Sequence, residues 1–320
     1  MKNFGIIGAA GYIAPRHMHA VKDLGHRLFV AYDRNDSVGI IDSISSDVHF
    51  FTEFERFFDF VSQAQSLPEE KLDYLIVCSP NHMHRSHISA GLRLGCDVIC
   101  EKPLVPLIED LNYLEALENE TGKRVWTILQ LRHHQAIINL KNSIADATDG
   151  HQFEVDLTYI TSRGKWYAES WKGNPRKSFG IETNIGIHFF DMLHFLFGPC
   201  FKSERHYADQ LRAGGYLEFQ QAKVRWFLST SQDDISALTS SEKSTYRSIT
   251  IDGREIEFSD GFTDLHQISY EHILAGKGFG VQDSRQCIET VENIRNSVSL
   301  HKPDKLNVAY ATKLFLRSDK

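Results

Sequence analysis

The sequence predicts an α/β protein in which a doubly wound parallel sheet is followed by an α+β domain with a mostly antiparallel open sheet. Over the first third of the chain, short apolar runs alternate with amphipathic segments of helical length, which is typical of βαβ units. From residue 153 onward, alternating apolar and polar runs follow one another instead. A length of 320 residues with 42% hydrophobic residues supplies two cores. We therefore expect two domains, at residues 1–126 and 127–320.

The first domain is expected to hold six strands, most of them followed by a helix. The expected strands are Phe4–Ile7, Leu28–Tyr32, Val48–Phe51, Leu72–Cys78, Asp97–Cys100 and Arg124–Leu129. The expected helices run from the first glycine turn to about Lys22, over Glu53–Gln65, from His84 to about Leu94 and over Ile108–Thr121.

The second domain is expected to begin with a linking helix at Leu131–Ile144 and to continue as a sheet. The expected strands are Phe153–Thr161, Phe201–Ala208, Tyr216–Phe219, Lys223–Thr230, Tyr246–Ile251 and Glu255–Phe258. Its two helix-rich parts are Thr183–Phe197 and Asp264–Asn296.

Composition excludes several classes of function. A net charge of −7 without a long basic run argues against nucleic acid as a partner. No apolar stretch reaches the length of a membrane span, and the first residues lead directly into a strand, so we expect a cytoplasmic protein without membrane partners. The five cysteines form no metal-type pair and indicate reduced thiols rather than disulfides.

The turn after the first strand has the parts of a dinucleotide site of the Rossmann type. It reads Gly8-x-x-Gly11-x-x-Ala14, and Asp33 ends the next strand. Glycines allow a pyrophosphate to approach the helix N-terminus, and an acidic residue about twenty positions on accepts from the adenosine ribose. The alternative is a tight strand-to-helix turn with no ligand. Asp33 favours NAD over NADP, while the neighbouring Arg34 weakens that preference.

Further cofactor contacts are expected at the carboxyl ends of the central strands. The full expected set is Gly8, Gly11, Tyr12, Ile13, Asp33, Ser79, Asn81, His84, Glu101 and Lys102. Histidines at 82, 84 and 87 invite a metal interpretation, but no second ligand cluster accompanies them, so we expect no metal site.

Lys102 lies where an apolar strand runs into Glu101-Lys102-Pro103. Ligands of open α/β sheets bind at that edge, and Pro103 favours an extended conformation at the residue before it. Lys102 can therefore contact a substrate hydroxyl. The alternative is a solvated lysine at a strand end.

A second polar series lies on the helix predicted at 183–197. Asn184, His188 and Asp191 are spaced four and three residues apart, so one face of an otherwise apolar helix is polar. Burying such groups without partners costs about 1–3 kcal/mol for each. The series therefore indicates a purpose beyond packing.

Together the glycine turn, Glu101-Lys102-Pro103 and Gly186-x-His188-x-x-Asp191 resemble the Gfo/Idh/MocA family of nicotinamide-dependent sugar oxidoreductases. Within the family, Gly8–His17, Gln130–His134 and Ser170–Gly173 are most similar to the WlbA/WbpB type, which oxidises UDP-N-acetylglucosaminuronate (UDP-GlcNAcA) at C3 in nucleotide-sugar and surface-polysaccharide (O-antigen, lipopolysaccharide) biosynthesis.

This resemblance implies NAD at the glycine turn, a second domain that binds the sugar, and a homo-oligomer, either a dimer or a tetramer. It also implies that Lys102 and His188 are catalytic, with His188 as general base and Lys102 polarising the hydroxyl oxygen, although Lys102 as the base stays open. Asn184 departs from the aspartate of many relatives, so hydrogen bonding is its expected role. Some enzymes of this type recycle the cofactor with 2-oxoglutarate.

The stretch Arg163–Lys177 is basic in an acidic chain and is the expected site of the UDP-sugar acid. The expected substrate contacts are Arg163, Lys165, Tyr167, Trp171, Lys172, Arg176, Asn184 and His188. The alternative is a solvated loop anchored by its aromatic residues. Two other functions also stay open: dehydrogenation of another sugar or polyol, and a non-catalytic dinucleotide-binding regulatory protein.

Overall fold

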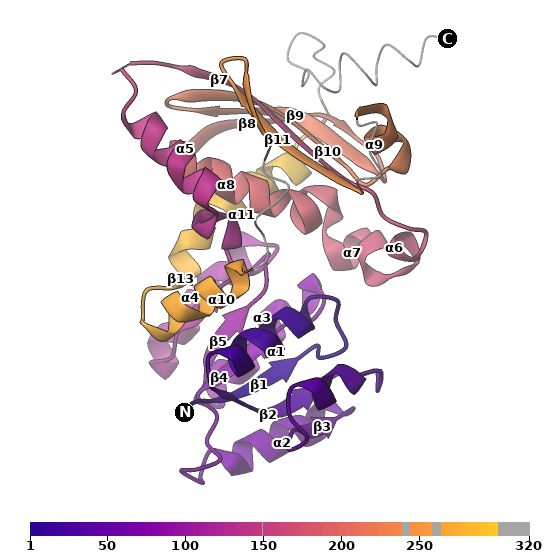
Figure 1. Cartoon of the computed structure of the whole chain (residues 1–320), viewed down its shortest axis with the longest axis vertical. Coiled ribbons are helices and arrows are strands. Elements are labelled where there is room, and N and C mark those ends of the chain that lie inside the picture. Colours follow the sequence, from indigo (N-terminus) through magenta and orange to yellow (C-terminus); the bar gives the residue numbers. More distant parts are fainter. Residues whose placement is uncertain (149, 239–243, 258–263, 300–320) are drawn as a thin grey trace. The chain divides into compact units, whose positions relative to one another are not determined.

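The computed structural model describes residues 1–148, 150–238, 244–257 and 264–299 (Figure 1). The chain divides into two compact units, Met1–Gln130 with Thr263–Arg285 and Leu131–Phe262 with Gln286–Lys320. Within the described ranges, no helix has the length and apolar character needed to cross a membrane. All five cysteines are free thiols.

The first unit is built on a seven-stranded sheet. Its strands are β1 (Asn3–Ile7), β2 (Arg27–Tyr32), β3 (His49–Phe51), β4 (Tyr74–Val77), β5 (Asp97–Cys100), β6 (Val125–Thr127) and β13 (Phe279–Gly280). Their order is β3-β2-β1-β4-β5-β6-β13, with β13 antiparallel to β6 and every other pair parallel. The first six strands confirm the predicted doubly wound sheet, whose order reverses between β1 and β4, and ligands of such sheets bind at that point.

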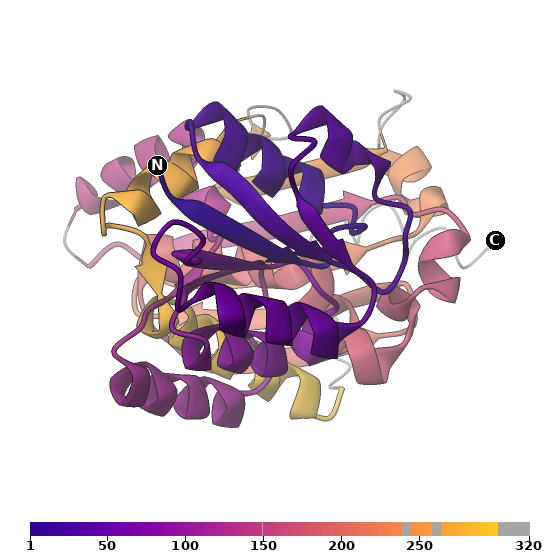
Figure 2. The same cartoon turned by 90° about the horizontal axis from the view of Figure 1, so that it is seen from below.

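Helices cover both faces of this sheet (Figure 2). They are α1 (Ala14–Asp23), α2 (Phe54–Ala64), α3 (His84–Arg93), α4 (Ile108–Thr121) and α10 (Leu265–Leu274), with 3₁₀ turns at Gly39–Ser43 and Asn81–Met83. α10 packs against α1, and its Tyr270 and Ile273 are buried in the same core as Phe4 and Ile76. A segment from late in the chain thus completes the first unit.

The second unit is built on a six-stranded sheet. Its strands are β7 (Phe153–Thr161), β8 (Cys200–Ala208), β9 (Arg212–Phe219), β10 (Ala222–Ser229), β11 (Thr245–Ile251) and β12 (Arg254–Glu257). In the order β12-β11-β7-β10-β9-β8, only β7 and β10 are parallel neighbours. The mostly antiparallel sheet is as predicted. The predicted strand end Phe258 lies outside the described residues.

β9 begins four residues earlier than the sequence pattern indicates. Gly214 and Gly215 obscure the start of this strand in the sequence, because glycine is depleted in strands. A Cβ on Gly215 would lie 2.1 Å from the Glu204 carbonyl oxygen and 2.7 Å from the Trp226 ring. The glycine leaves room for that indole, and its lack of a side chain removes the alternation on which the prediction depends.

The helices of the second unit are α5 (Gln135–Ala145), α6 (Trp166–Glu169), α7 (Pro175–Ser178), α8 (Ile187–Phe197) and α9 (Gln232–Leu238), and α11 (Val281–Asn296) ends in it. The linking helix starts at Gln135 rather than Leu131, because Gln130–His133 forms a 3₁₀ turn and His134 caps α5. The helix predicted from Thr183 is split into a π-helical turn at Glu182–Gly186 and α8. Turns of this kind are frequent at functional sites.

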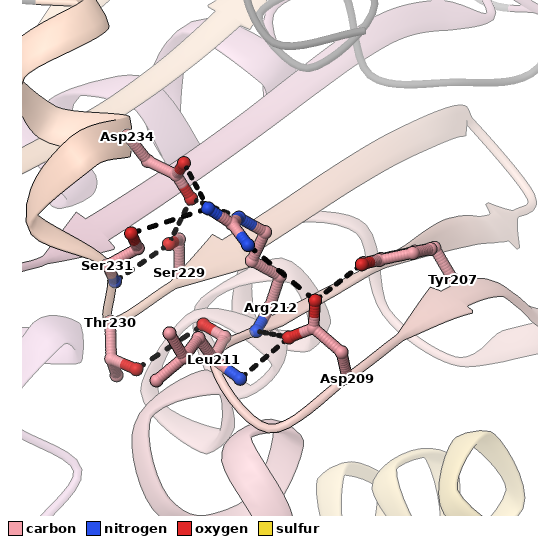
Figure 3. A network of polar contacts seen from close by, with 8 residues as sticks. All are labelled: Tyr207, Asp209, Leu211, Arg212, Ser229, Thr230, Ser231 and Asp234. Carbon is pink, nitrogen blue, oxygen red and sulfur yellow. Dashed lines mark hydrogen bonds and ion pairs between the residues drawn. The ribbon is translucent and has the colours of Figure 1, made fainter. Parts of the chain in front are cut away.

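A polar network ties the β8–β9 turn to the start of α9 (Figure 3). The Arg212 guanidinium donates to both carboxylate oxygens of Asp234, at 2.7 and 2.8 Å, and Ser229 donates to Asp234 as well. Asp209 accepts from the Arg212 N–H at 2.7 Å and from the Tyr207 hydroxyl. Every group drawn has a partner inside the network, so it holds the sheet end together.

Candidate active site

The glycine turn lies directly against the end of β4. Gly8 has φ +90°, and a Cβ there would lie 2.7 Å from the Cys78 carbonyl carbon and oxygen. A Cβ on Gly11 would lie 2.9 Å from the Gly8 oxygen, and the Gly11 N–H donates to that same oxygen. α1 begins three residues later, so bare backbone leads into a helix N-terminus. This arrangement fits a bound pyrophosphate.

Asp33, at the end of β2, is held beside this turn. One carboxylate oxygen accepts from the Ala10 N–H at 2.9 Å and the other from the Asn35 N–H at 2.9 Å. A carboxylate has about four acceptor positions, so capacity for a ribose hydroxyl is left. Among its expected neighbours, the Tyr12 side chain is 77% exposed and Ile13 is half-buried.

The residues after β4 are buried and support the sheet edge. Ser79, Asn81 and His84 are all below 8% exposed. The two ring nitrogens of His84 lie 2.8 Å from the Ser79 carbonyl oxygen and 2.7 Å from that of Pro103. His84 thus bridges the ends of β4 and β5, and burial lowers the pKa of its imidazole. Its contact with a cofactor stays a prediction.

Lys102 is the one partly exposed residue in a run that is otherwise buried from Val98 to Pro106. Its N–H donates to a carboxylate oxygen of Glu101 at 3.1 Å. On the other side, the Pro103 carbonyl oxygen contacts His84, and the Lys102–Pro103 peptide bond is cis. The backbone of Lys102 is therefore held on both sides while its side chain reaches the surface.

Glu101 is the centre of a buried cluster that no local sequence pattern indicates. Its Oε1 lies 3.0 Å from His17 Nε2 and 3.0 Å from His266 Nε2. His17 Nδ1 lies 2.8 Å from the Tyr270 hydroxyl. Burial alone would raise the pKa of Glu101, but the hydrogen bonds from both histidines hold it well below its usual range. Burial lowers the pKa of His17.

In the second unit, His188 lies in the first turn of α8. It is the one partly exposed residue between Ile181 and His194, whose other residues are buried. Asn184, in the π-helical turn, donates to the Tyr167 hydroxyl. Asp191 is 2% exposed at its side chain and accepts two hydrogen bonds from the Arg132 guanidinium, at 3.0 and 2.7 Å. The polar series thus has partners, and Arg132 is the one that the sequence analysis missed.

The predicted basic segment folds as three short helical turns, α6, Trp171–Gly173 and α7. Its exposed cations are Arg163, Lys165, Arg176 and Lys177, and no carboxylate of the described residues forms an ion pair with them.

Aromatic rings stabilise this segment. The Lys172 ammonium lies 5.2 Å and 5.6 Å from the ring centroids of Trp166 and Trp171. Residues 168–171, 173–175 and 177 line an open pocket of about 470 Å³, which includes the side chains of Trp171 and Lys177. Cations without acidic partners, next to aromatic rings, suit an anionic ligand with a ring system.

Family models match both halves of the chain. Residues 2–129 match the oxidoreductase family's NAD-binding Rossmann fold, and residues 150–300 match its C-terminal alpha/beta domain. The chain belongs to the Gfo/Idh/MocA family. This confirms the predicted family and an oxidoreductase that uses NAD.

Among solved structures, this Gfo/Idh/MocA protein is similar to the WlbA (WbpB) dehydrogenase from Thermus thermophilus. In complex with NAD and UDP-GlcNAcA, that protein is 42% identical, with a TM-score of 0.92 over 96% of this chain and 99% of that chain. A second structure of it, with NAD and alpha-ketoglutarate, has a TM-score of 0.90. The resemblance to the WlbA/WbpB type is thereby confirmed.

Curated relatives are more distant. Glucose-6-phosphate 3-dehydrogenase from Bacillus subtilis is 25% identical over 64% of this chain and 56% of that protein. D-glucoside 3-dehydrogenase from Escherichia coli is 27% identical over 45% of this chain and 46% of that protein. The matches therefore span about half the length of these two relatives.

Proposed function

We propose that this protein oxidises the C3 hydroxyl of a UDP-sugar acid of the UDP-N-acetylglucosaminuronate type to the 3-keto sugar, with NAD as the oxidant. One observation carries the proposal: the 42% identity, over nearly the whole of both chains, to a dehydrogenase whose complex holds NAD and UDP-GlcNAcA. The names of the two curated relatives, both 3-dehydrogenases, support oxidation at C3.

The cofactor is proposed to bind at the carboxyl edge of the first sheet. The glycine turn takes the pyrophosphate, Asp33 accepts from the ribose 2′-hydroxyl, and Lys102 faces the reacting end. NAD bound there supplies the acceptor for a hydride from the sugar carbon. A 2′-phosphate would meet the Asp33 carboxylate, so we expect a preference for NAD that Asp33→Ala abolishes.

His188 is proposed to take the proton from the C3 hydroxyl, while the Lys102 ammonium donates a hydrogen bond to the same oxygen. Each of the two is the one partly exposed member of a buried run, which suits a side chain that is held in place and still contacts a ligand. The reverse assignment, with Lys102 as base, predicts the larger loss for the lysine variant.

The basic segment is proposed to bind the diphosphate and the uronate carboxylate. Its four exposed cations have no acidic partner among the described residues, which leaves them available for an anion. Tyr167 and Trp171 offer ring faces for the sugar or the base. Asn184, held by Tyr167, is expected to hydrogen-bond the substrate.

The decisive experiment uses substrate deuterated at C3. Deuterium should appear in the reduced nicotinamide, and NMR should place the carbonyl of the product at C3. His188→Asn and Lys102→Met should each lower kcat about 10²–10⁴-fold with nearly unchanged NAD affinity. Label that stays in the sugar would refute oxidation at C3, and full activity in both variants would refute the mechanism.

The substrate class is tested with the basic segment. Lys165→Ala with Arg176→Ala should raise the KM for UDP-GlcNAcA far more than that for NAD. Arg254→Ala, an exposed cation on β12, serves as the matched control and should change neither KM. Faster turnover of a sugar phosphate or a free polyol than of UDP-GlcNAcA would replace the substrate assignment.

We also propose the finer context expected from the sequence: a cytoplasmic homo-oligomer that acts in surface-polysaccharide biosynthesis and recycles its cofactor with 2-oxoglutarate. The alpha-ketoglutarate complex of the Thermus thermophilus protein supports the recycling step. In the recycling step, NADH and a proton reduce 2-oxoglutarate to 2-hydroxyglutarate. Enzyme with substoichiometric NAD should then form 3-keto sugar and 2-hydroxyglutarate in equal amounts.

Light scattering of the purified protein tests the proposed oligomeric state.

A further inference from the structure

We propose that the Glu101 clamp, which we define as Glu101, His17, His266 and Tyr270, positions Lys102 for catalysis. The inference rests on the proposed role of Lys102 in the oxidation. It gives the four residues a positioning role. Through His266 and Tyr270, α10 from late in the chain then helps to position the proposed catalytic lysine of the first unit.

The clamp joins three elements of the first unit at one carboxylate. His17 lies on α1, Glu101 follows β5, and His266 and Tyr270 lie on α10. Oε1 of Glu101 accepts from both histidines at 3.0 Å, and Oε2 accepts from the Lys102 N–H at 3.1 Å. One side of the carboxylate is therefore fixed to two helices, and the other side holds the backbone of the lysine.

The hydrogen-bond geometry indicates which ring nitrogens carry a proton. Both histidines must carry a proton on Nε2 to donate to the carboxylate, and His17 Nδ1 can then accept from the Tyr270 hydroxyl. His266 Nδ1 is buried without a hydrogen-bond partner. A bare lone pair there is tolerable, whereas an N–H would be a buried donor without an acceptor. The consistent hydrogen-bond pattern is an ionised Glu101 that accepts from the Nε2–H of both histidines.

Burying such an anion is costly unless donors surround it. Here three N–H donors do so, and one of them belongs to the residue that carries the proposed catalytic ammonium. All four clamp residues are below 7% exposed. His84 holds the following Pro103 carbonyl oxygen in the same way. The backbone on both sides of Lys102 is thus fixed by buried side chains.

The same atoms could in principle ligate a metal, since His17, Glu101 and His266 offer ligand atoms within 4.8 Å of one another. The hydrogen-bond description accounts for the geometry better. Both histidines contact a single oxygen at hydrogen-bond distance, and the other oxygen holds a backbone N–H, which a metal would not require. Metal binding is therefore an outcome that the experiment must detect.

The test compares His266→Leu, which cannot donate to Glu101, with His266→Gln, whose amide can. We expect kcat to fall about 10-fold to 100-fold in His266→Leu and to recover in His266→Gln, with NAD affinity unchanged in both. The deuterium isotope effect at C3 should rise in His266→Leu, because hydride transfer slows. His194→Leu removes a buried histidine outside the clamp and should lower the Tm without changing kcat or the isotope effect.

A readout independent of the sugar keeps the clamp and the proposed function apart. Lysines methylated with ¹³C-formaldehyde give NMR signals, and that of Lys102 is assigned by its loss in Lys102→Arg. The signal should shift in His266→Leu and return in His266→Gln, with or without substrate. If no sugar is oxidised but the signal shifts in this way, the function fails and the clamp stands.

Two outcomes would overturn the clamp. An unchanged Lys102 signal together with unchanged kcat in folded His266→Leu would show that the network only stabilises the fold. Stoichiometric zinc that survives desalting, measured by mass spectrometry and lost in His17→Gln, would replace the clamp by a metal site.

Discussion

The buried ion pair between Arg132 and Asp191 gives the sharpest prediction for the second unit. Arg132→Met removes the guanidinium and keeps most of the side-chain volume. Asp191 lies on α8 three residues after His188, and each of its carboxylate oxygens would lose the hydrogen bond from the guanidinium. Two effects should follow: lower stability of the unit, and a less well-placed His188.

The magnitude follows from burial. The side chains of Arg132 and Asp191 are 10% and 2% exposed, so water cannot replace the guanidinium. Breaking such a pair by removing one partner costs about 3–5 kcal/mol. Arg225, which is likewise bidentate to Asp156, lies 26% exposed on the sheet and gives the matched comparison. Arg225→Met should cost less than Arg132→Met, because the two carboxylates that contact Arg225, Asp156 and Glu154, are 13% and 50% exposed and water can reach them.

The assay is urea unfolding of each variant with kcat measured on the folded protein. Arg132→Met should lose most of the activity at unchanged NAD affinity, whereas Arg225→Met should retain it. Adding Asp191→Asn to Arg132→Met removes the unpaired charge and should recover part of the stability. A cost below about 1 kcal/mol for Arg132→Met, or no recovery in the double variant, would refute the reasoning from an uncompensated buried charge.

Two further predictions concern the cofactor turn and acid stability. Gly8→Ala should abolish NAD binding in a titration, because its Cβ would lie 2.7 Å from backbone atoms. Gly25 also has a positive φ, but no atom lies within 4 Å of the position of its Cβ, so Gly25→Ala should lower stability without changing NAD binding. Equal NAD affinities of the two variants would contradict the clash. Burial lowers the pKa of His87 and of His194 to about 4. Below pH 6.5 these two histidines are therefore protonated in the unfolded chain but stay neutral in the folded chain until the pH approaches 4. Stability should fall by about 2 kcal/mol for each histidine between pH 7 and pH 5, and His194→Gln should remove its share in pH-dependent unfolding; an unchanged pH slope would contradict the burial argument.

The fold could be predicted from sequence wherever its cause is local. Runs such as Leu72–Cys78 alternate with amphipathic helices, so the strands of the first sheet were found to within a few residues. β13 has two residues, and they pair with β6 residues 152 and 154 positions earlier in the sequence, so no local pattern predicts this pairing. For the same reason the sequence did not assign α10 to the first unit.

The candidate site also has features that local sequence predicts and features that depend on distant parts of the chain. Gly8 and Gly11 could be recognised because a tight approach of backbone to backbone requires glycine at those positions. The partners of Glu101 are 84 and 165 residues away, and the partner of Asp191 is 59 residues away. In the sequence these carboxylates lie one and three residues from the predicted catalytic Lys102 and His188, but only the fold shows that they are buried and which donors surround them.

The buried negative charges of Glu101 and Asp191 are stabilised by different kinds of donor. Glu101 is surrounded by N–H donors and keeps its charge, whereas Asp191 is matched by a guanidinium, so that pair has no net charge. Glu101→Gln therefore keeps the shape of the side chain but turns its NH₂ group toward groups that also donate. Asp191→Asn removes the carboxylate charge that pairs with the Arg132 guanidinium. Since a buried donor without an acceptor costs about 1–3 kcal/mol and an uncompensated buried charge about 3–5 kcal/mol, Asp191→Asn should destabilise the protein more. Glu101→Gln should act chiefly on kcat, because the contact that it disturbs is the one to the backbone of Lys102.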